Sequence, residues 1–363
     1  MVTNVVIKQN SFERILVIKL RHFGDVLLIT PLLTTLQQHA PNAKIDVLLY
    51  SGTEKILSKD KTIHHFWTID RQLKRAGIKA QILGEWALFQ SLKKQNYSLI
   101  LNLSDQWRSA FYARFLKPQF SIGFHYAKRD NALWFSCYDH LVPVSNHVKQ
   151  HTVINNLSIL DPLKLSKIST RVSMSYGSDD IFYVEKILHE RLLSDYILIH
   201  PFARWHFKTW SAAYFSQLIN YLTAQREKIV ITGGPEKTER DYVLNVIEYC
   251  NQKDEIVNLV GLVSFSQLAV LIDRAQVFIG VDSVAMHMAA ALKTPSVVLF
   301  GPSNIKQWHP WNAPYTLLWA GDHRELPFPW EVDTSTSDRY LDAIPLEKVI
   351  DAVDFWRAQH KVR

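Results

Sequence analysis

Short β-branched apolar runs alternate with longer amphipathic segments along most of this chain, and the alternation occurs twice. This pattern is typical of parallel α/β sheets, whose buried strands are connected by helices. In the first half the predicted strands are 15–20, 44–50, 64–69 and 98–103, with helices at 26–39 and 83–95. In the second half the predicted strands are 196–200, 228–232, 255–259, 277–281 and 296–300, with helices at 211–225, 237–250, 264–275 and 283–292. Residues 104–150 are less regular.

A length of 363 residues exceeds one ordinary core and fits two. The periodicity is interrupted over 160–178, where we place the linker. We therefore predict an α/β protein of two doubly wound, Rossmann-like domains, residues 1–172 and 173–345, that face a cleft. The last segment, 346–363, is predicted to be helical, and docking back onto the first domain is one arrangement open to it. Ligands of such sheets bind beyond the carboxyl ends of the strands, so the chemistry should lie in strand-to-helix loops.

Charge is unevenly divided in a chain whose formal net charge is +7. Residues 1–175 carry 23 Lys and Arg against 11 Asp and Glu, whereas residues 176–363 carry 18 against 23. A basic domain attracts anionic partners such as nucleic acid, phosphorylated lipid or a membrane surface. A scattered set of solvated cations is the alternative that composition leaves open.

The loop after the first predicted strand contains Arg21, His22, Gly24 and Asp25. Gly24 suits a tight turn before the next helix, which places Asp25 at the helix N-terminus. Asp25 can serve there as an N-cap. Alternatively, its carboxylate can act as a general base that takes the proton from an attacking hydroxyl.

The predicted strand 277–281 leads into an Ala-rich helix through Asp282, Ser283 and Val284. Free N–H groups in the first turn of a helix, together with the helix dipole, make an anion site. We expect Asp282 or Ser283 to cap this helix. His287 lies one turn further on the same face, where it either reaches the bound anion or is a core histidine.

Two more loops follow strands of the second half. Arg204 and Lys208 come after the strand 196–200, where cations can neutralise the charge on a departing phosphate; solvated surface cations are the alternative. Glu236 ends the turn 232–236, where a nucleotide base or ribose could approach the backbone. With these cations we expect no metal, and the two cysteines are not spaced as metal ligands.

Several function classes are disfavoured. The chain has no Walker A sequence, no G-x-G-x-x-G after the first strand and no H-E-x-x-H. It also has no apolar run of about 18 residues, and its N-terminus does not resemble a signal peptide, so we expect a cytoplasmic protein.

Four segments, in the same order along the chain, resemble the lipopolysaccharide-core heptosyltransferases of glycosyltransferase family 9. They are residues 18–31 (IKLRHFGDVLLITP), Lys208 before Trp210, residues 233–236 (GGPE), and residues 281–287 (VDSVAMH) followed by 299–302 (LFGP). The resemblance covers nearly the full length. Residues 44–50 and 102–107 are further similar to the heptosyltransferase III branch, which adds a heptose to a heptose of the core.

The resemblance implies a GT-B fold, with the acceptor on the N-terminal domain and ADP-heptose on the C-terminal domain. It implies inverting transfer without metal or cofactor, with Asp25 as the base and Lys208 on the donor phosphate. Residues carried over to the donor site are Asp282, Ser283, Val284, His287, Arg204 and Glu236. Candidates on the acceptor side are Arg21, His22 and Gly24.

The sequence departs from the family pattern at Phe202, where relatives often have a small hydroxylated residue, and at Val284, where Gly or Ala is common. Phe202 lacks that hydroxyl, so we do not expect the contacts that the hydroxyl makes in relatives, and the branched Val284 narrows the approach to the main chain. The resemblance further implies a monomer that meets a phosphorylated core acceptor at the cytoplasmic face of the inner membrane and binds no nucleic acid. The alternatives are a GT-B transferase with another donor or acceptor, a nucleotide-sugar epimerase, and a basic module that binds nucleic acid or an anionic surface.

Overall fold

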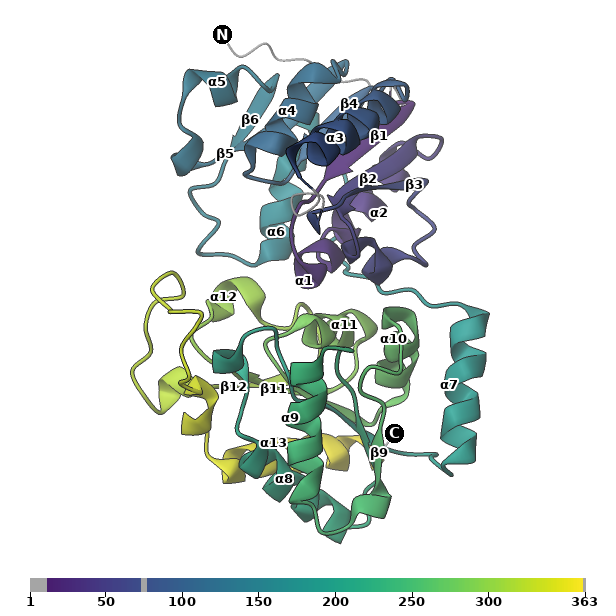
Figure 1. The fold of residues 1–363 in the computed structure, drawn as a ribbon, viewed down its shortest axis with the longest axis vertical. Coiled ribbons are helices and arrows are strands. Elements are labelled where there is room, and N and C mark those ends of the chain that lie inside the picture. Colours follow the sequence, from purple (N-terminus) through teal and green to yellow (C-terminus); the bar gives the residue numbers. More distant parts are fainter. Residues whose placement is uncertain (1–11, 73–76, 362–363) are drawn as a thin grey trace. The chain divides into compact units, whose positions relative to one another are not determined.

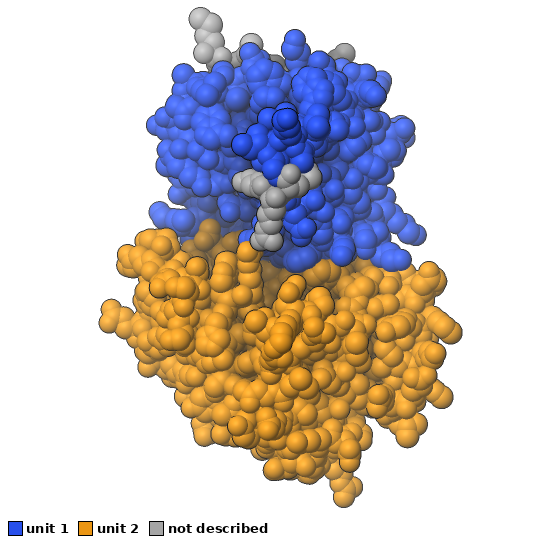
Figure 2. All heavy atoms as spheres, in the orientation of Figure 1, with its two compact units in different colours: residues 1–173 blue, residues 174–363 orange. Residues whose placement is uncertain are grey.

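The computed structural model describes residues 12–72 and 77–361. The chain forms two compact units, Met1–Ser173 and Met174–Arg363, which Figure 2 colours separately. The division between them falls inside the stretch 160–178, where the sequence periodicity is interrupted.

In the described part of the first unit, six parallel strands form one sheet in the order β3-β2-β1-β4-β5-β6. The strands are β1 (Arg14–Ile18), β2 (Lys44–Tyr50), β3 (His65–Ile69), β4 (Leu99–Asn102), β5 (Phe120–His125) and β6 (His140–Pro143). The α-helices are α1 (Phe23–Leu27), α2 (Thr30–His39), α3 (Ile78–Lys93), α4 (Trp107–Phe115), α5 (Ala132–Phe135) and α6 (Thr152–Leu157).

The described part of the second unit repeats this topology, with six parallel strands in the order β12-β11-β10-β7-β8-β9. The strands are β7 (Ile197–His200), β8 (Ile229–Ile231), β9 (Ile256–Asn258), β10 (Val277–Val281), β11 (Ser296–Phe300) and β12 (Tyr315–Trp319). The α-helices are α7 (Ser178–Glu190), α8 (Ala212–Ala224), α9 (Lys237–Glu248), α10 (Phe265–Arg274), α11 (Val284–Leu292), α12 (Ile305–Trp308) and α13 (Leu346–Lys361).

The central strands of both sheets are apolar along their whole length because helices cover both faces. Ile15 to Ile18 of β1 are fully buried, as are Val277 to Ile279 of β10. In the second unit α10 contacts α7 and α11, whereas α8 contacts α9 and α13, which gives two helix layers (Figure 1). The sheet is therefore the middle layer of three.

Side-chain caps begin two of these helices where the sequence predicts them. The Ser211 hydroxyl accepts a hydrogen bond from the N–H of Tyr214 and opens α8. Ser264 and Gln267 exchange the two hydrogen bonds of a capping box at the start of α10. Such caps satisfy N–H groups that have no partner within the helix.

The order of strands changes direction at one place in each sheet, between β1 and β4 and between β7 and β10. In doubly wound sheets the loops diverge at this switch point, and ligands bind beyond the carboxyl ends of the strands there. The loops that follow β1, β4, β7 and β10 are therefore the places to examine for function.

The C-terminal helix packs into the second unit. α13 packs against α8 and against strands β10, β11 and β12 of the second unit. The indole N–H of Trp356 donates to Thr316, and the guanidinium of Arg357 pairs with Glu227. The apolar face of α13 thus completes the core of the second unit. Docking back onto the first domain stays a prediction.

The sequence reading also left out several elements. Residues 104–150 contain α4, β5, α5 and β6, and the Trp-rich region after Gly301 contains β12. In place of the single helix predicted over 26–39, the chain forms two helices, α1 (Phe23–Leu27) and α2 (Thr30–His39). The predicted fold class, α/β with two doubly wound sheets, is confirmed.

Candidate active site

An ion pair connects the loops that follow β7 and β10 at the switch point of the second unit. The Nζ atom of Lys208 lies 2.5 Å from Oδ2 of Asp282. Lys208 ends the short 3-10 helix His206–Lys208, and Asp282 directly follows β10. Two residues 74 positions apart are thereby held at the place where this fold binds ligands.

Asp282 is a buried carboxylate that remains ionised. Burial pushes its pKa upward, but the Lys208 ammonium and the Ser303 hydroxyl outweigh burial and hold the pKa below its usual value. The Ser303 hydroxyl donates to the same Oδ2 atom at 2.6 Å. The sequence reading missed Ser303, although it follows the Gly-Pro pair that ends the 299–302 motif.

The ion pair determines what each partner can do for an anionic ligand. A carboxylate repels phosphate, so Asp282 is suited to orient Lys208 and not to touch a diphosphate. An ammonium has three N–H donors, and the bond to Asp282 uses one of them. Lys208 therefore keeps donors for a second anion while its position is already determined.

The N-terminus of α11 begins beside this pair. Ser283 occupies the N-cap position in extended conformation, and Val284 is the first helical residue. Ser283 does not cap the helix with its side chain, because its buried hydroxyl has no hydrogen-bond partner among the described residues. The first-turn N–H groups thus keep their capacity to bind an anion.

His287 lies one turn into α11 and is buried. Its ring centroid is 6.1 Å from that of Trp308, and His287 is one of the groups that lower the pKa of the Asp282 carboxyl. His287 therefore belongs to the same group of residues as Lys208 and Asp282. A direct contact between His287 and a ligand stays a prediction.

Arg204 and Lys208 flank one indole ring. The Arg204 guanidinium lies 5.5 Å from the centroid of Trp205, and the Lys208 ammonium lies 5.2 Å from it. These are cation–π distances, which stiffen two long side chains in an otherwise irregular loop. Phe202, one of the departures from the family pattern, is half-buried and packs against Tyr242, with the two ring centroids 5.4 Å apart.

Glu236 is exposed at the N-cap position of α9, and its side chain makes no capping hydrogen bond within the described structure. The turn before it is held instead by Glu239, whose carboxylate accepts a hydrogen bond of 2.6 Å from the N–H of Gly234. A side chain at Gly234 would place its Cβ 2.9 Å from a Glu239 oxygen. Burial is the main cause of the raised pKa of Glu239, a residue that the sequence reading missed.

The first unit has a similar ion pair at its own switch point. The Arg21 guanidinium, after β1, lies 3.3 Å from the carboxylate of Asp105, after β4. Lys128 pairs with the same carboxylate. Burial raises the pKa of Asp105, but Lys128 and Arg21 outweigh burial, so the pKa is lowered and the carboxylate stays charged. The sequence reading identified Arg21 but not its partners.

Asp25 is the third residue of α1 and lies half-exposed in its first turn. The N-cap interpretation of Asp25 is wrong, because His22 occupies that position. Gly24 lies inside α1 and has no positive φ, so the tight turn predicted before the helix is not formed at this residue. The Asp25 carboxylate has no hydrogen-bond or ion-pair partner among the described residues, which leaves it open to accept a proton.

Lys19, at the end of β1, is a buried cation that the sequence reading missed. Its ammonium donates to Oδ1 of Asn156 at 2.9 Å. Burial lowers its pKa from 10.5 to about 8, and the charge of Asp25 opposes this shift. Lys19 thus adds positive potential behind Asp25.

Among residues 12–72 and 77–361, no group of three or more His, Cys, Asp or Glu side chains is placed to hold a metal ion. Over the same residues, every helix is too short or too polar to cross a bilayer.

Comparisons with known proteins agree with the sequence resemblance. The family model described as glycosyltransferase family 9 (heptosyltransferase) matches residues 85–329. The chain is 38% identical over 336 residues to lipopolysaccharide heptosyltransferase 3 of Escherichia coli. This match covers 92% of this chain and 96% of that protein.

Solved structures confirm the fold. The glycosyl transferase family 9 protein of Veillonella parvula superimposes with a TM-score of 0.83 at 20% identity, covering 98% of this chain and all of that one. The E. coli heptosyltransferase WaaC with ADP-2-deoxy-2-fluoro heptose gives a TM-score of 0.67 at 20% identity, covering 84% and 92% of the two chains. The predicted GT-B fold, with two Rossmann-like domains, is therefore confirmed.

Proposed function

The chain belongs to glycosyltransferase family 9, the heptosyltransferases, and from this we propose that it transfers heptose from ADP-heptose to a heptose of the lipopolysaccharide inner core. The identity to a heptosyltransferase 3 over nearly the whole chain supports the reaction and the acceptor class. A related structure bound to an ADP-heptose analogue supports the donor.

The observation that carries this proposal is the Lys208–Asp282 pair beside the N-terminus of α11. We assign the donor diphosphate to Lys208 and to the N–H groups of the first turn of α11. Asp282 orients Lys208, and His287 and Arg204 complete the donor side. Glu236 is assigned to the nucleoside end because it lies on the loop after β8, the strand next to β7.

In the proposed reaction Asp25 accepts the proton of the attacking hydroxyl as its oxygen bonds to the anomeric carbon. The bond from that carbon to the diphosphate oxygen breaks, and ADP leaves with the electron pair. Attack from the face opposite the diphosphate inverts the anomeric carbon. Lys208 and the helix N–H groups stabilise the negative charge that grows on the leaving group, a role that fixed donors fill without a metal.

The first unit is the proposed acceptor side. Its basic excess suits a phosphorylated saccharide, and Arg21 and Lys128 lie beside each other on Asp105, close to the loop with Asp25. His22 and Gly24 are assigned to the acceptor side with Arg21. We propose that the protein works as a monomer at the cytoplasmic face of the inner membrane, where lipid-anchored acceptors are presented.

Mass spectrometry tests the function. Purified protein is incubated with ADP-heptose and a lipopolysaccharide core truncated before the next heptose, and the acceptor should gain the mass of one heptose. ADP release without that gain would mean hydrolysis and would contradict the proposal. Donor alone, analysed for an isomerised sugar, separates transfer from epimerisation.

A further inference from the structure

Two neighbouring helices of the first unit present large apolar side chains to solvent. On α3 the exposed apolar side chains recur every four residues, at Ile78, Ile82 and Trp86, and Leu83 is exposed as well. Those of α4 have the same spacing: Trp107, Phe111 and Phe115. Residues four apart share one helix face, so each helix carries a continuous apolar stripe that faces outward.

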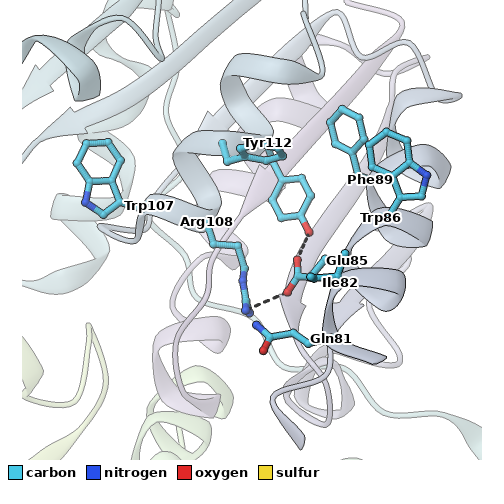
Figure 3. Close-up of a pocket in the computed structure, with 9 residues that line it drawn as sticks. Gln81, Ile82, Glu85, Trp86, Phe89, Trp107, Arg108 and Tyr112 are labelled. Atoms are coloured by element: carbon cyan, nitrogen blue, oxygen red, sulfur yellow. Dashed lines mark hydrogen bonds and ion pairs between the residues drawn. The ribbon is translucent and has the colours of Figure 1, made fainter. Parts of the chain in front are cut away.

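The two stripes lie side by side on one surface. Glu85 of α3 pairs with Arg108 of α4 at 2.9 Å and accepts a hydrogen bond of 2.8 Å from Tyr112. The rings of Phe89 and Phe111 lie 5.8 Å apart. Figure 3 shows Arg108 and Tyr112 converging on Glu85 in the groove between the helices, with Trp86 and Trp107 on either side. The groove has a volume of about 470 Å³.

Basic residues predominate over acidic ones on the two helices that form this surface. Residues 78–94 and 107–117, all within the described part of the chain, contain one acidic residue, Glu85, and Arg108 neutralises it. The basic residues of the two segments are Lys79, Lys93, Lys94, Arg108, Arg114 and Lys117. All of these except Arg108 are exposed. We call the apolar stripes and these cations the α3–α4 face.

We propose that the α3–α4 face docks on an anionic phospholipid bilayer. An amphipathic surface that combines exposed Trp, Phe and Ile side chains with Lys and Arg is what partitions into the boundary between headgroups and acyl chains. The cations match the negative surface of such a membrane, and tryptophan is enriched at this depth. Charge complementarity thus selects a bilayer over an uncharged protein partner.

The location of the face connects docking to catalysis, and this step rests on the proposed function. α3 and α4 follow β3 and β4, so their N-termini lie at the same edge of the sheet as the loop with Asp25. The Arg129 guanidinium carbon lies 5.2 Å from the ring centroid of Trp107. The same guanidinium donates a hydrogen bond of 2.8 Å from Nε to the carbonyl of Asp105. A docked bilayer would therefore keep lipid-anchored acceptors beside that edge.

Vesicle sedimentation with the full-length protein tests the docking. We expect binding to vesicles of phosphatidylglycerol and phosphatidylethanolamine, weaker binding to pure phosphatidylcholine, and a decrease as salt is raised. The double variant Ile82→Ser/Trp86→Ser should bind the anionic vesicles at least tenfold more weakly. Phe182→Ser, which removes a 72% exposed side chain from α7 of the second unit, is the matched control and should bind like wild type.

Two further measurements make the outcome decisive. Thermal unfolding should be nearly unchanged in the double variant, since the replaced side chains are exposed and Ser resembles Ile and Trp in helix propensity. Transfer to a deacylated, water-soluble core saccharide should be unchanged, whereas transfer to vesicle-embedded acceptor should fall. If no heptose is transferred to either acceptor, the proposed function fails while vesicle binding still tests the face.

Three results would overturn the docking proposal. The first is wild-type protein that does not bind anionic vesicles, and the second is a double variant that binds them as wild type does. The third is a lipid-free dimer, seen by sedimentation velocity, that the double variant abolishes, because the face would then be an interface with a second copy.

Discussion

The ammonium of Lys208 and the carboxylate of Asp282 form an ion pair between the ends of the adjacent strands β7 and β10, with Nζ and Oδ2 2.5 Å apart. Arg21 and Asp105 form the corresponding pair between β1 and β4 in the first unit. In both units a cation from the first strand's loop is held by an aspartate from the fourth strand's loop. The topology thus orients a positive group at each switch point before a substrate arrives.

Lys208→Ala removes the proposed contact with the donor diphosphate. Loss of a single preorganised donor to a developing negative charge typically costs about 10²- to 10³-fold in rate, and we expect a fall of that size in kcat/KM. Steady-state kinetics and ADP titration calorimetry measure it. Lys237→Ala, at an exposed lysine of α9, is the matched control and should retain wild-type kinetics. Wild-type kinetics for Lys208→Ala would remove Lys208 from the site.

The same pair makes a prediction about stability. Lys208→Met leaves the buried Asp282 carboxylate without its cation, which should lower the free energy of unfolding by up to about 3 kcal/mol. The double variant Lys208→Met/Asp282→Leu removes both charges and should lose less than the single variant. Urea unfolding of wild type, both single variants and the double variant completes the cycle. Additive losses would show that the two residues are not coupled.

Asp25→Asn keeps the size of the side chain and removes the proposed base. General-base catalysis contributes about 10²- to 10⁴-fold, so kcat should fall by that factor. The affinity for ADP should stay within about twofold, because the acceptor-side carboxylate does not hold the donor. The comparison variant Asp70→Asn changes an exposed carboxylate of the same unit and should keep its activity. Turnover within tenfold of wild type would rule out Asp25 as the base.

Lys19 predicts a stability change at alkaline pH. Burial lowers its pKa to about 8 in the folded state, so between about pH 8 and 10.5 the unfolded chain binds more protons there than the folded chain does. The contribution of Lys19 to the free energy of unfolding therefore rises as the pH increases through that window, by up to about 3 kcal/mol. The difference in unfolding free energy between wild type and Lys19→Met isolates the effect. A difference that does not change from pH 7.5 to 10 would contradict it.

The sequence predicted most of the second unit because strands such as 277–281 are uninterrupted apolar runs and helices such as α10 begin with a capping box. The sequence did not predict the elements of 104–150. There α5 and β6 have only four residues each, too few to display the periodicity of a helix or a strand. Lys208 and Asp282 were identified separately, each from its place after a strand. Their pairing was not, because it depends on β7 and β10 being neighbours in the sheet.

The missed residues share the same physical reason. Lys19 ends a strand and looks like a solvated lysine until Asn156, 137 residues away, is brought against it. Asp105 contributes through its contacts with Arg21 and Lys128, and Ser303 through its contact with Asp282. The local sequence pattern identifies the loop in which a residue lies. The partner that this residue contacts is determined by the three-dimensional fold.

We propose that Lys208, oriented by Asp282 at the N-terminus of α11, holds the donor diphosphate. A crystal structure of the protein with ADP tests it most directly. We predict a β-phosphate oxygen within about 3 Å of Lys208 Nζ and of a first-turn N–H of α11, with the Lys208–Asp282 pair intact. ADP bound away from both groups, or held by the protein with Lys208 turned away from it, would contradict the claim.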